Sequence, residues 1–311
     1  MITLNVEPNT SPLTWEDFIG TKPPFSIALD GYVSAGPKFF QSKDGPYENF
    51  NHHEEVSRLE TRATCAQAFY SVRLGLYKFL FKTMNGEPHS NLYVNDCDHD
   101  VCLSCCILRN PHIVEGDVNP RLHQLVHMED LLDTMSGAYQ FPAHLPAIEE
   151  LNWVFYPYDH FRVKGGLRRR KKEEFEQVID EVEKRILDFI DGRGQTMELD
   201  TSYYECLTFP TWRMVHEIGS NARIGLFRDG INAFVTLRAL PNKRFIYSIG
   251  RWSNWIPFPI PRIIEQLNIA ENSADDRWGG SPTIGGSPRV NGSKLLPMEV
   301  AEIINRVLAS M

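Results

Sequence analysis

The sequence of 311 residues predicts an α/β protein, in which a parallel-sheet domain precedes a smaller α+β domain that carries a glycine-rich loop. In the first 145 residues, short apolar runs alternate with amphipathic ones, as a sheet covered by helices requires. Near the C-terminus, strand-like and helical runs enclose residues 279–286, where four of the eight positions are glycine. We expect a first domain at 1–150, a helical linker at 151–200 and a second domain at 201–311.

The expected elements of the first domain and the linker follow in chain order. They are a strand that ends near Asp30, a long amphipathic helix at 61–84, a strand at 90–94, a helix from 101, and a helical segment at 120–139. In the linker, apolar residues recur with the 3.6-residue period between Gly166 and Gly192, which predicts one long helix. In open α/β sheets, ligands collect at the carboxyl ends of the strands.

The second domain shows shorter elements. Residues 222–240 are interpreted as a hairpin around Asp229 and Gly230, because that dipeptide suits a tight turn. A strand at 244–252, a helix at 260–271 and a closing helix at 298–310 follow. The glycine-rich stretch lies between these two helices, and its glycine content predicts a loop there.

The composition excludes some classes of function. A net charge of −8 argues against wide, non-specific binding to duplex nucleic acid, although it leaves room for a small nucleotide or a short strand. No apolar run approaches the roughly 18 to 20 residues of a membrane span, and the N-terminus lacks the blocks of a signal peptide. We expect a cytoplasmic protein with no membrane partner, and we leave a homodimer open.

Two features each allow two interpretations. The cysteines at 102, 105 and 106 include a CxxC spacing that could hold zinc, but their apolar surroundings favour reduced cysteines in a buried helix. The basic run at 168–172 is either a solvated helix start, balanced by the acidic residues that follow, or the basic lip of an active-site cleft.

Acidic and histidine side chains follow the expected strands. Asp30 ends one strand, His52 and His53 form a pair in a loop, and three alternate aspartates, Asp96, Asp98 and Asp100, follow the strand at 90–94. Carboxylates this close repel each other, and a divalent cation would relieve that repulsion. A solvated acidic turn is the alternative. Carboxylate and imidazole ligands together suit Mn²⁺ or Mg²⁺, whereas thiolates would favour zinc.

These motifs resemble those of the DHH phosphoesterase superfamily, which includes RecJ exonucleases, manganese pyrophosphatases and small-nucleotide phosphodiesterases. The stretch NDCDHDVCLS at 95–104 is similar to the family's DxDxDGxxS element, and FNHHEE at 50–55 is similar to its Asp-His-His signature. Asp30 matches the family's single strand-end aspartate. Asp130 matches its helical aspartate, with Asp133 as the alternative.

The C-terminal half also resembles the family. VTLRA at 235–239 is similar to its Ser-Leu-Arg strand, and WGGSPTIGGSPR at 278–289 is similar to its glycine-rich substrate loop. The resemblance implies that substrate is bound by Arg238, Gly279, Gly280, Ser281, Gly285, Gly286 and Arg289. Arginine pairs with phosphate, and glycine lets the backbone approach it closely.

The resemblance also implies a metal site and a reaction. Two Mn²⁺ or Mg²⁺ ions would be bound by Asp30, His52, Asp98, Asp100 and Asp130, with Asp30 bridging them. Asp98, Asp100 and His53 would be catalytic, and His53 would face the substrate phosphate. Two ions can stabilise both the attacking and the leaving oxygen of a phosphoester. The expected activity is hydrolysis of a nucleotide, a dinucleotide or a short single-stranded oligonucleotide.

Several departures from the family keep other interpretations open. Asn51 replaces the signature aspartate, and Ser281 and Pro282 replace a glycine and a histidine of the loop. His99 and Val101 replace small residues of the acidic element. The acidic element also follows the His pair in the chain, whereas the family's order is the reverse. A nucleotide-binding or assembly protein with a degraded site is one alternative, and an unrelated α/β protein is the other.

Overall fold

The computed structural model describes residues 1–135, 141–142, 145–240, 242–288 and 290–311. It confirms an α/β fold with two sheets. The chain divides into two compact units, Met1–Tyr139 with Pro146–Glu198, and Gln140–Leu145 with Leu199–Met311. Among the described residues, no helix is both long and apolar enough to cross a membrane.

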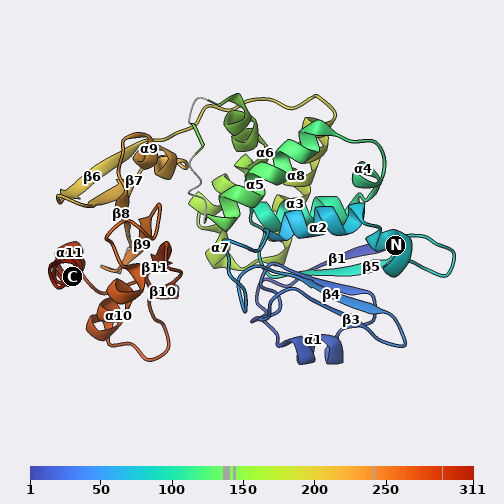
Figure 1. Ribbon diagram of the computed structural model, residues 1–311, viewed down its shortest axis with the longest axis horizontal. Coiled ribbons are helices and arrows are strands. Elements are labelled where there is room, and N and C mark those ends of the chain that lie inside the picture. The colour runs from blue at the N-terminus through green and yellow to red at the C-terminus, as the bar shows by residue number, and fades with distance from the viewer. Residues whose placement is uncertain (136–140, 143–144, 241, 289) are drawn as a thin grey trace. The chain divides into compact units, whose positions relative to one another are not determined.

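The sheet of the first unit has the strand order β1-β5-β2-β4-β3 (Figure 1). Its strands are β1 (Ile2–Val6), β2 (Ser26–Leu29), β3 (Lys38–Gln41), β4 (Pro46–Phe50) and β5 (Ser90–Val94). All neighbours run parallel except β3, which pairs antiparallel with β4. β2 is buried along its whole length, as a central strand covered on both faces must be.

Helices cover both faces of this sheet (Figure 1). α1 (Trp15–Thr21) lies on one face, where Phe18 packs among Tyr32, Tyr47 and Tyr93. The other helices are α2 (Thr64–Arg73), α3 (His99–Arg109), α4 (His112–Glu115), α5 (Pro120–Thr134), α6 (Pro146–Val163), α7 (Gly166–Arg169) and α8 (Lys172–Ile190). Of these, α2, α3 and α8 contact the strands on the opposite face, and α5 packs on α2 and α3. Five cysteines are buried and all six are free of disulfides, and those at 102, 105 and 106 lie in α3, as the interpretation of a buried helix expects.

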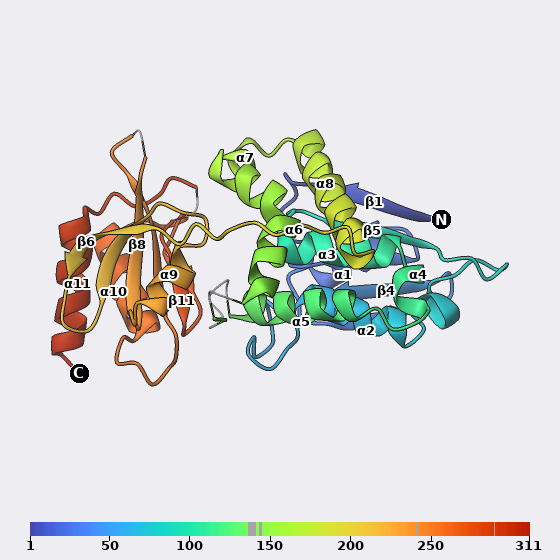
Figure 2. The same ribbon diagram turned by 90° about the horizontal axis from the view of Figure 1, so that it is seen from above.

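The region expected as a linker at 151–200 is part of the first unit. The apolar stripe of α8 is buried, and α8 packs against α3, α6 and β1, with α6 beside it (Figure 2). The stripe predicted a helix that needs a partner, and the sheet-covering helices supply one, so the division falls near 198 instead of 150. In the basic run, Arg169 and Lys171 pair with Glu174, and Lys172 pairs with Glu176, as the solvated-helix interpretation expects.

The long helix predicted at 61–84 is wrong in its second half. α2 ends at Arg73, and a π-helical turn η1 (Leu76–Leu80) follows. Gly75 lies between them with φ of +99°, a backbone conformation that residues other than glycine rarely adopt. The amphipathic pattern continues across this break, so periodicity alone did not reveal it.

The second unit contains a six-stranded sheet in the order β10-β11-β9-β8-β7-β6. Its strands are β6 (Tyr203–Thr208), β7 (Arg213–Glu217), β8 (Ala233–Ala239), β9 (Phe245–Arg251), β10 (Gly279–Gly280) and β11 (Ile284–Gly286). α10 (Ile260–Glu271) and α11 (Pro297–Ala309) share one buried core with the sheet, which includes Trp212, Tyr247 and Ile249.

The hairpin predicted around Asp229 and Gly230 is wrong. Residues Ala222–Arg228 form helix α9, and Asp229 and Gly230 end it. β7 and β8 run parallel, and a two-residue turn cannot connect parallel strands, so the chain needs this helical crossover. A dipeptide that suits a hairpin turn suits the end of a helix equally well.

The glycine-rich stretch forms a small antiparallel hairpin, β10 and β11, at the edge of this sheet. A Cβ at Gly280 would lie 2.3 Å from both Gly285 Cα and Ile284 O, whereas a Cβ at Gly279 would meet nothing within 4 Å. Close backbone packing therefore explains Gly280 but not Gly279.

We expect Gly280→Ala to destabilise the protein by about 1–3 kcal/mol, because backbone atoms of the facing strand must move. Gly279→Ala is the matched control on the same strand and should change stability by less than about 0.5 kcal/mol. Urea unfolding followed by tryptophan fluorescence measures both. Equal effects of the two substitutions would contradict this account of the hairpin.

Candidate metal centre

The candidate site lies where three neighbouring parallel strands end. Asp30 follows β2, His52 and His53 follow β4, and Asp98 and Asp100 follow β5. The strand order places β2 between β5 and β4, so the three strand ends are adjacent. The unusual chain order of the motifs therefore does not separate them in space.

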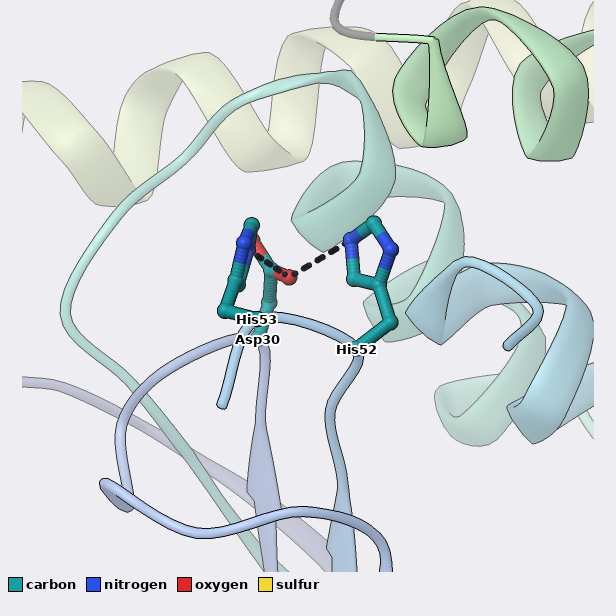
Figure 3. A group of neighbouring side chains, drawn as sticks. All are labelled: Asp30, His52 and His53. Atoms are coloured by element: carbon teal, nitrogen blue, oxygen red, sulfur yellow. Dashed lines mark hydrogen bonds and ion pairs between the residues drawn. The ribbon is translucent and has the colours of Figure 1, made fainter. Parts of the chain in front are cut away.

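Asp30 occupies a tight turn at the end of β2. Asp30 and Gly31 both have positive φ, at 45° and 76°, and the Asp30 N–H donates to Phe50 O on β4. The turn directs Asp30 Oδ1 at His53 Nε2, 2.8 Å away, and at His52 Nε2, 3.6 Å away (Figure 3). Burial opposes ionisation, but these histidines and the Thr64 hydroxyl outweigh it and lower the pKa of Asp30 to about 2.

Asn51 holds the loop that carries the two histidines. Its Nδ2 donates to Val33 O and Ala35 O, at 3.1 and 2.8 Å, and its Oδ1 accepts the N–H groups of His52 and His53. The side chain is fully buried. A carboxylate oxygen in place of Nδ2 would face two carbonyl oxygens and the Glu54 carboxylate, so the local structure requires an amide at this position.

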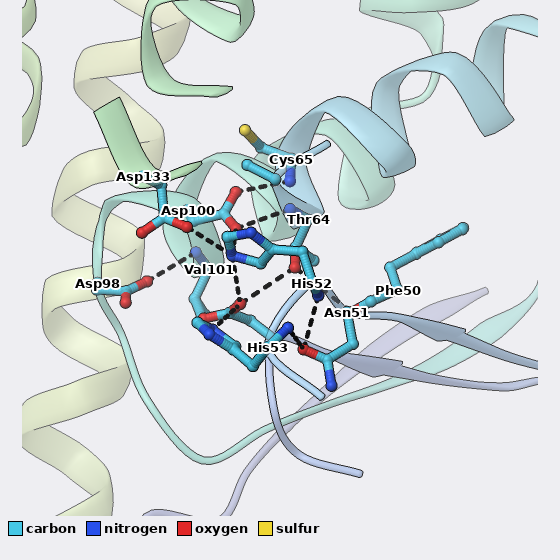
Figure 4. Close-up of polar contacts among 12 residues, drawn as sticks. Phe50, Asn51, His52, His53, Thr64, Cys65, Asp98, Asp100, Val101 and Asp133 are labelled. Atoms are coloured by element: carbon cyan, nitrogen blue, oxygen red, sulfur yellow. Dashed lines mark hydrogen bonds and ion pairs between the residues drawn. The ribbon is translucent and has the colours of Figure 1, made fainter. Parts of the chain in front are cut away.

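His52 lies at the centre of the group and is fully buried (Figure 4). Its Nε2 is 2.6 Å from Asp133 Oδ2, 3.6 Å from Asp30 Oδ1 and 3.8 Å from Asp100 Oδ2. The short contact with Asp133 is not aligned as a hydrogen bond, and neither ring nitrogen has a hydrogen-bond partner in the part of the chain that the structure describes. A buried ring nitrogen surrounded by carboxylate oxygens is an arrangement that a cation can satisfy.

Asp100 is bound to the first turn of α2. Its Oδ2 and Oδ1 accept the N–H groups of Thr64 and Cys65, at 2.8 and 2.6 Å (Figure 4). The helix N-terminus favours the charged carboxylate. Burial, followed by the charges of Asp30 and Asp133, nevertheless raises the pKa of Asp100 well above its usual value.

Asp98 caps α3, since its Oδ1 accepts the Val101 N–H at 3.0 Å. Figure 4 shows its carboxylate at the side of the group, farther from His52 than the carboxylates of Asp100 and Asp133. Burial, and then the charges of Asp30 and Asp96, raise the pKa of Asp98 well above its usual value. Asp98 is therefore repelled by Asp96 and Asp100, as the alternation of the three aspartates in the sequence predicts.

The structure brings Asp133, the alternative, to the cluster in place of Asp130. Asp133 Oδ2 contacts His52 Nε2 at 2.6 Å and Arg58 at 3.3 Å. Asp130 instead accepts the Ala63 N–H at 2.7 Å and pairs with Arg62 at 2.9 Å, so both its oxygens are directed at the start of α2. One turn of α5 separates the two roles.

Two overlapping groups of side chains have the spacing of metal ligands, Asp30 with His52 and His53, and His52 with Asp100 and Asp133. Their oxygen and imidazole donors fit Mn²⁺ or Mg²⁺. A ring nitrogen binds one ion only, so His52 can serve either group but not both. A second ion would therefore need donors other than His52.

Comparisons with known proteins add no relative. No protein-family model matches this chain, and no curated protein matches it. The site therefore rests on its own geometry.

The expected substrate residues lie in the second unit. Arg238 is on β8, opposite Ile246 of β9, and Gly286 is on β11, opposite Ser248 of the same strand. Ser281 forms the turn of the glycine hairpin, where its Oγ accepts the Ile284 N–H at 3.2 Å. Gly279, Gly280, Gly285 and Gly286 form its two strands. Arg289 lies outside the described residues.

Sequence reasoning missed two residues of the site. Thr64 donates its hydroxyl to Asp30 Oδ1 at 3.1 Å, and Arg58 bonds both the backbone oxygen and Oδ2 of Asp133. Both follow the histidine pair within 12 residues, in the polar segment and helix start that the resemblance includes. Their position shortly after the histidine pair could have indicated that they lie near the site. No sequence spacing, however, distinguishes them from the other polar residues of that segment.

We expect Mn²⁺ to raise the Tm of the protein more at pH 8 than at pH 5. Without metal, ionising Asp98 and Asp100 destabilises the fold as the pH rises above about 3.9, the unfolded value, because their folded pKa values are raised. His53 acts in the same direction above about 6.5, since its pKa is also raised. Asp30, with a pKa of about 2, stays ionised throughout.

Scanning calorimetry of EDTA-treated protein, with and without Mn²⁺, measures this difference. The double variant Asp98→Asn with Asp100→Asn should lose the part of the pH dependence that these two carboxyl groups contribute and keep the part from His53. A Tm increment that is the same at both pH values in the unsubstituted protein would contradict the assignment.

Asp133→Asn should weaken Mn²⁺ binding by about tenfold or more, because it removes a charged oxygen beside His52. Asp130→Asn is the matched control one turn away on α5. It should leave Mn²⁺ affinity unchanged and cost about 1–2 kcal/mol of stability through the weakened contact with the α2 N-terminus. Mn²⁺ titration by calorimetry distinguishes them, and the reverse ranking would restore Asp130 as the ligand.

Proposed function

We propose that this protein is a metal-dependent phosphoesterase of the DHH type, which hydrolyses a nucleotide, a dinucleotide or a short single-stranded oligonucleotide. The observation that carries the proposal is that Asp30, His52, His53 and Asp100, which follow three adjacent strand ends, meet Asp133 of α5. These five residues come from four separate motifs of the resemblance, with Asp133 in the position expected for Asp130. A solvated acidic turn would instead place these carboxylates at the surface, whereas Asp30 and Asp100 are buried.

Each side chain has a role that follows from its position. Asp30, His52, Asp100 and Asp133 would hold the ions, and Asp98 would add its second oxygen. Bound divalent ions supply an acidified water and neutralise charge on a phosphoester. Asp30 is directed by His53 and the Thr64 hydroxyl, so its carboxylate keeps one orientation.

His53 is the group that a substrate can reach. Its side chain is 28% exposed, whereas that of His52 is fully buried. Burial lowers the pKa of His53, but the Asp30 carboxylate outweighs it and the pKa is raised overall. The protonated ring can donate from Nδ1 to a phosphate oxygen while Nε2 stays on Asp30.

One observation favours the second candidate, a nucleotide-binding or assembly protein with a degraded site. Both oxygens of Asp100 and one oxygen of Asp98 accept backbone N–H groups, which occupies lone pairs that metal ligation uses. Asn51 gives this candidate no further support, because its amide is needed by the loop and its side chain bonds to backbone groups.

Hydrolysis assays with Mn²⁺ test the proposal. The substrates are dinucleotides, short single-stranded DNA and RNA, a phosphodiester dye and pyrophosphate. We expect turnover of at least one substrate and a loss of about a hundredfold or more in Asp30→Asn, because the central ligand charge is removed. Asp44→Asn, at an exposed turn of the same sheet, is the control and should keep full activity. Binding of Mn²⁺ and nucleotide without turnover would favour the second candidate.

Asn51→Asp should lower stability by about 2–4 kcal/mol without raising activity. The carboxylate oxygen that replaces Nδ2 would face Val33 O, Ala35 O and the Glu54 carboxylate in a buried position, where it finds no donor. Urea unfolding and the same hydrolysis assay measure the two effects. An increase of many fold in activity would show instead that the natural asparagine impairs catalysis.

A further inference from the structure

A cavity of about 370 Å³ lies between α2 and α5, close to the metal cluster but lined by other residues. Its lining includes Arg62, Phe69 and Tyr70 on one side and His123, His127 and Asp130 on the other. This volume is at the lower end of the roughly 300–1,000 Å³ range of small-molecule sites, which suits one ring system.

Several lining residues have planar side chains, namely the aromatic rings and the Arg62 guanidinium. The Arg62 guanidinium lies 4.8 Å from the centre of the Tyr70 ring, and Phe69 and His123 meet edge to face with ring centroids 4.8 Å apart. Arg62 is held in place by Asp130, at 2.9 Å. Aromatic rings and guanidinium planes are the surfaces on which planar heterocycles stack.

One residue of the lining also carries a polar atom that lacks a partner. His123 Nε2 is buried and has no hydrogen-bond partner among the residues that the structure describes. A simple anion matches this lining poorly, because Arg62 is already paired with Asp130.

The cavity and the metal cluster lie against the same helix start. Asp130, in the cavity lining, accepts the Ala63 N–H, and Asp100, in the cluster, accepts the next two N–H groups, those of Thr64 and Cys65. Asp133 of the cluster is one turn beyond Asp130 on α5. A ligand in the cavity is therefore separated from the cluster by little more than the first turn of α2.

We propose that this cavity is a nucleobase subsite, in which a heteroaromatic ring lies against Tyr70 and Arg62. As a substrate subsite it rests on the proposed function, because the cavity and the metal cluster lie against the same helix start. As a binding site for a nucleoside it does not depend on metal.

Calorimetric titration of the EDTA-treated protein with adenosine, guanosine, cytidine and uridine tests the proposal. We expect at least one nucleoside to bind without metal, and Tyr70→Ala to weaken that binding by about fivefold or more, which is the lower range for loss of one stacking contact. Tyr156→Ala is the matched control, because Tyr156 is also helical, similarly exposed at 38% against 42%, and lies under Arg185. It should bind as the unsubstituted protein does.

Two outcomes would overturn the subsite. One is equal nucleoside binding by the unsubstituted protein and Tyr70→Ala, and the other is no binding of any nucleoside. If Tyr70→Ala does not fold, as judged by circular dichroism, His127→Ala at the exposed rim replaces it, with the same expected direction.

The two proposals fail separately. Nucleoside binding that depends on Tyr70, without hydrolysis of any substrate, would keep the subsite and reject the phosphoesterase. Hydrolysis of a nucleotide with a KM and kcat that Tyr70→Ala leaves unchanged would keep the phosphoesterase and reject the subsite.

Discussion

The first turn of α2 is the part of the structure on which the candidate site depends. Ala63, which precedes this helix, has no side chain that can cap it, and carboxylates from two other helices bond the free amides. Asp130 of α5 takes the Ala63 N–H, and Asp100 of α3 takes those of Thr64 and Cys65. Each buried amide left unpaired would cost about 1–3 kcal/mol, so the three helices have one favourable arrangement. That arrangement brings Asp100 to His52.

Electrostatic repulsion is the cost of this arrangement. Asp30 remains ionised because two histidines and a hydroxyl stabilise its charge, with a pKa of about 2. Its charge, together with burial, raises the pKa values of Asp98 and Asp100. The pKa of Asp30 is lowered, whereas the pKa values of Asp98 and Asp100 are raised. A bound cation would stabilise the ionised form of all three carboxylates. The positive φ of Asp30 is a further local cost that places its oxygen between the two histidines.

The strand-end residues could be predicted from the sequence, because an apolar run that ends in Asp30 or in the acidic cluster shows where a strand stops. That these ends are adjacent depended on the strand order, which no local pattern contains. Asp130 and Asp133 are three residues apart on one helix, so both lie on a similar face and sequence alone could not choose between them. The packing of α5 against α2 decides between them, because it places Asp130 at the start of α2 and Asp133 at His52.

Other errors had different physical causes. The stripe of α8 indicated a buried face but not its partner, so a helix that packs on the first unit was expected as a linker. Asp229 and Gly230 suit a turn of several kinds, and the parallel pairing of β7 and β8 decided which kind forms. In both cases, tertiary contacts determined the outcome between structures with similar local preference.

Capping a helix and binding a metal are compatible on one carboxylate. A carboxylate offers about four lone-pair positions, and Asp100 uses two of them for the amides of α2, while Asp98 uses one for the amide of Val101. The remaining positions are still directed, because the amides fix the plane of each carboxylate, much as outer hydrogen bonds orient metal ligands elsewhere. A cation bound there would strengthen the same arrangement of α2 and α3 that holds its ligands. Metal affinity and the stability of these helices should therefore rise and fall together.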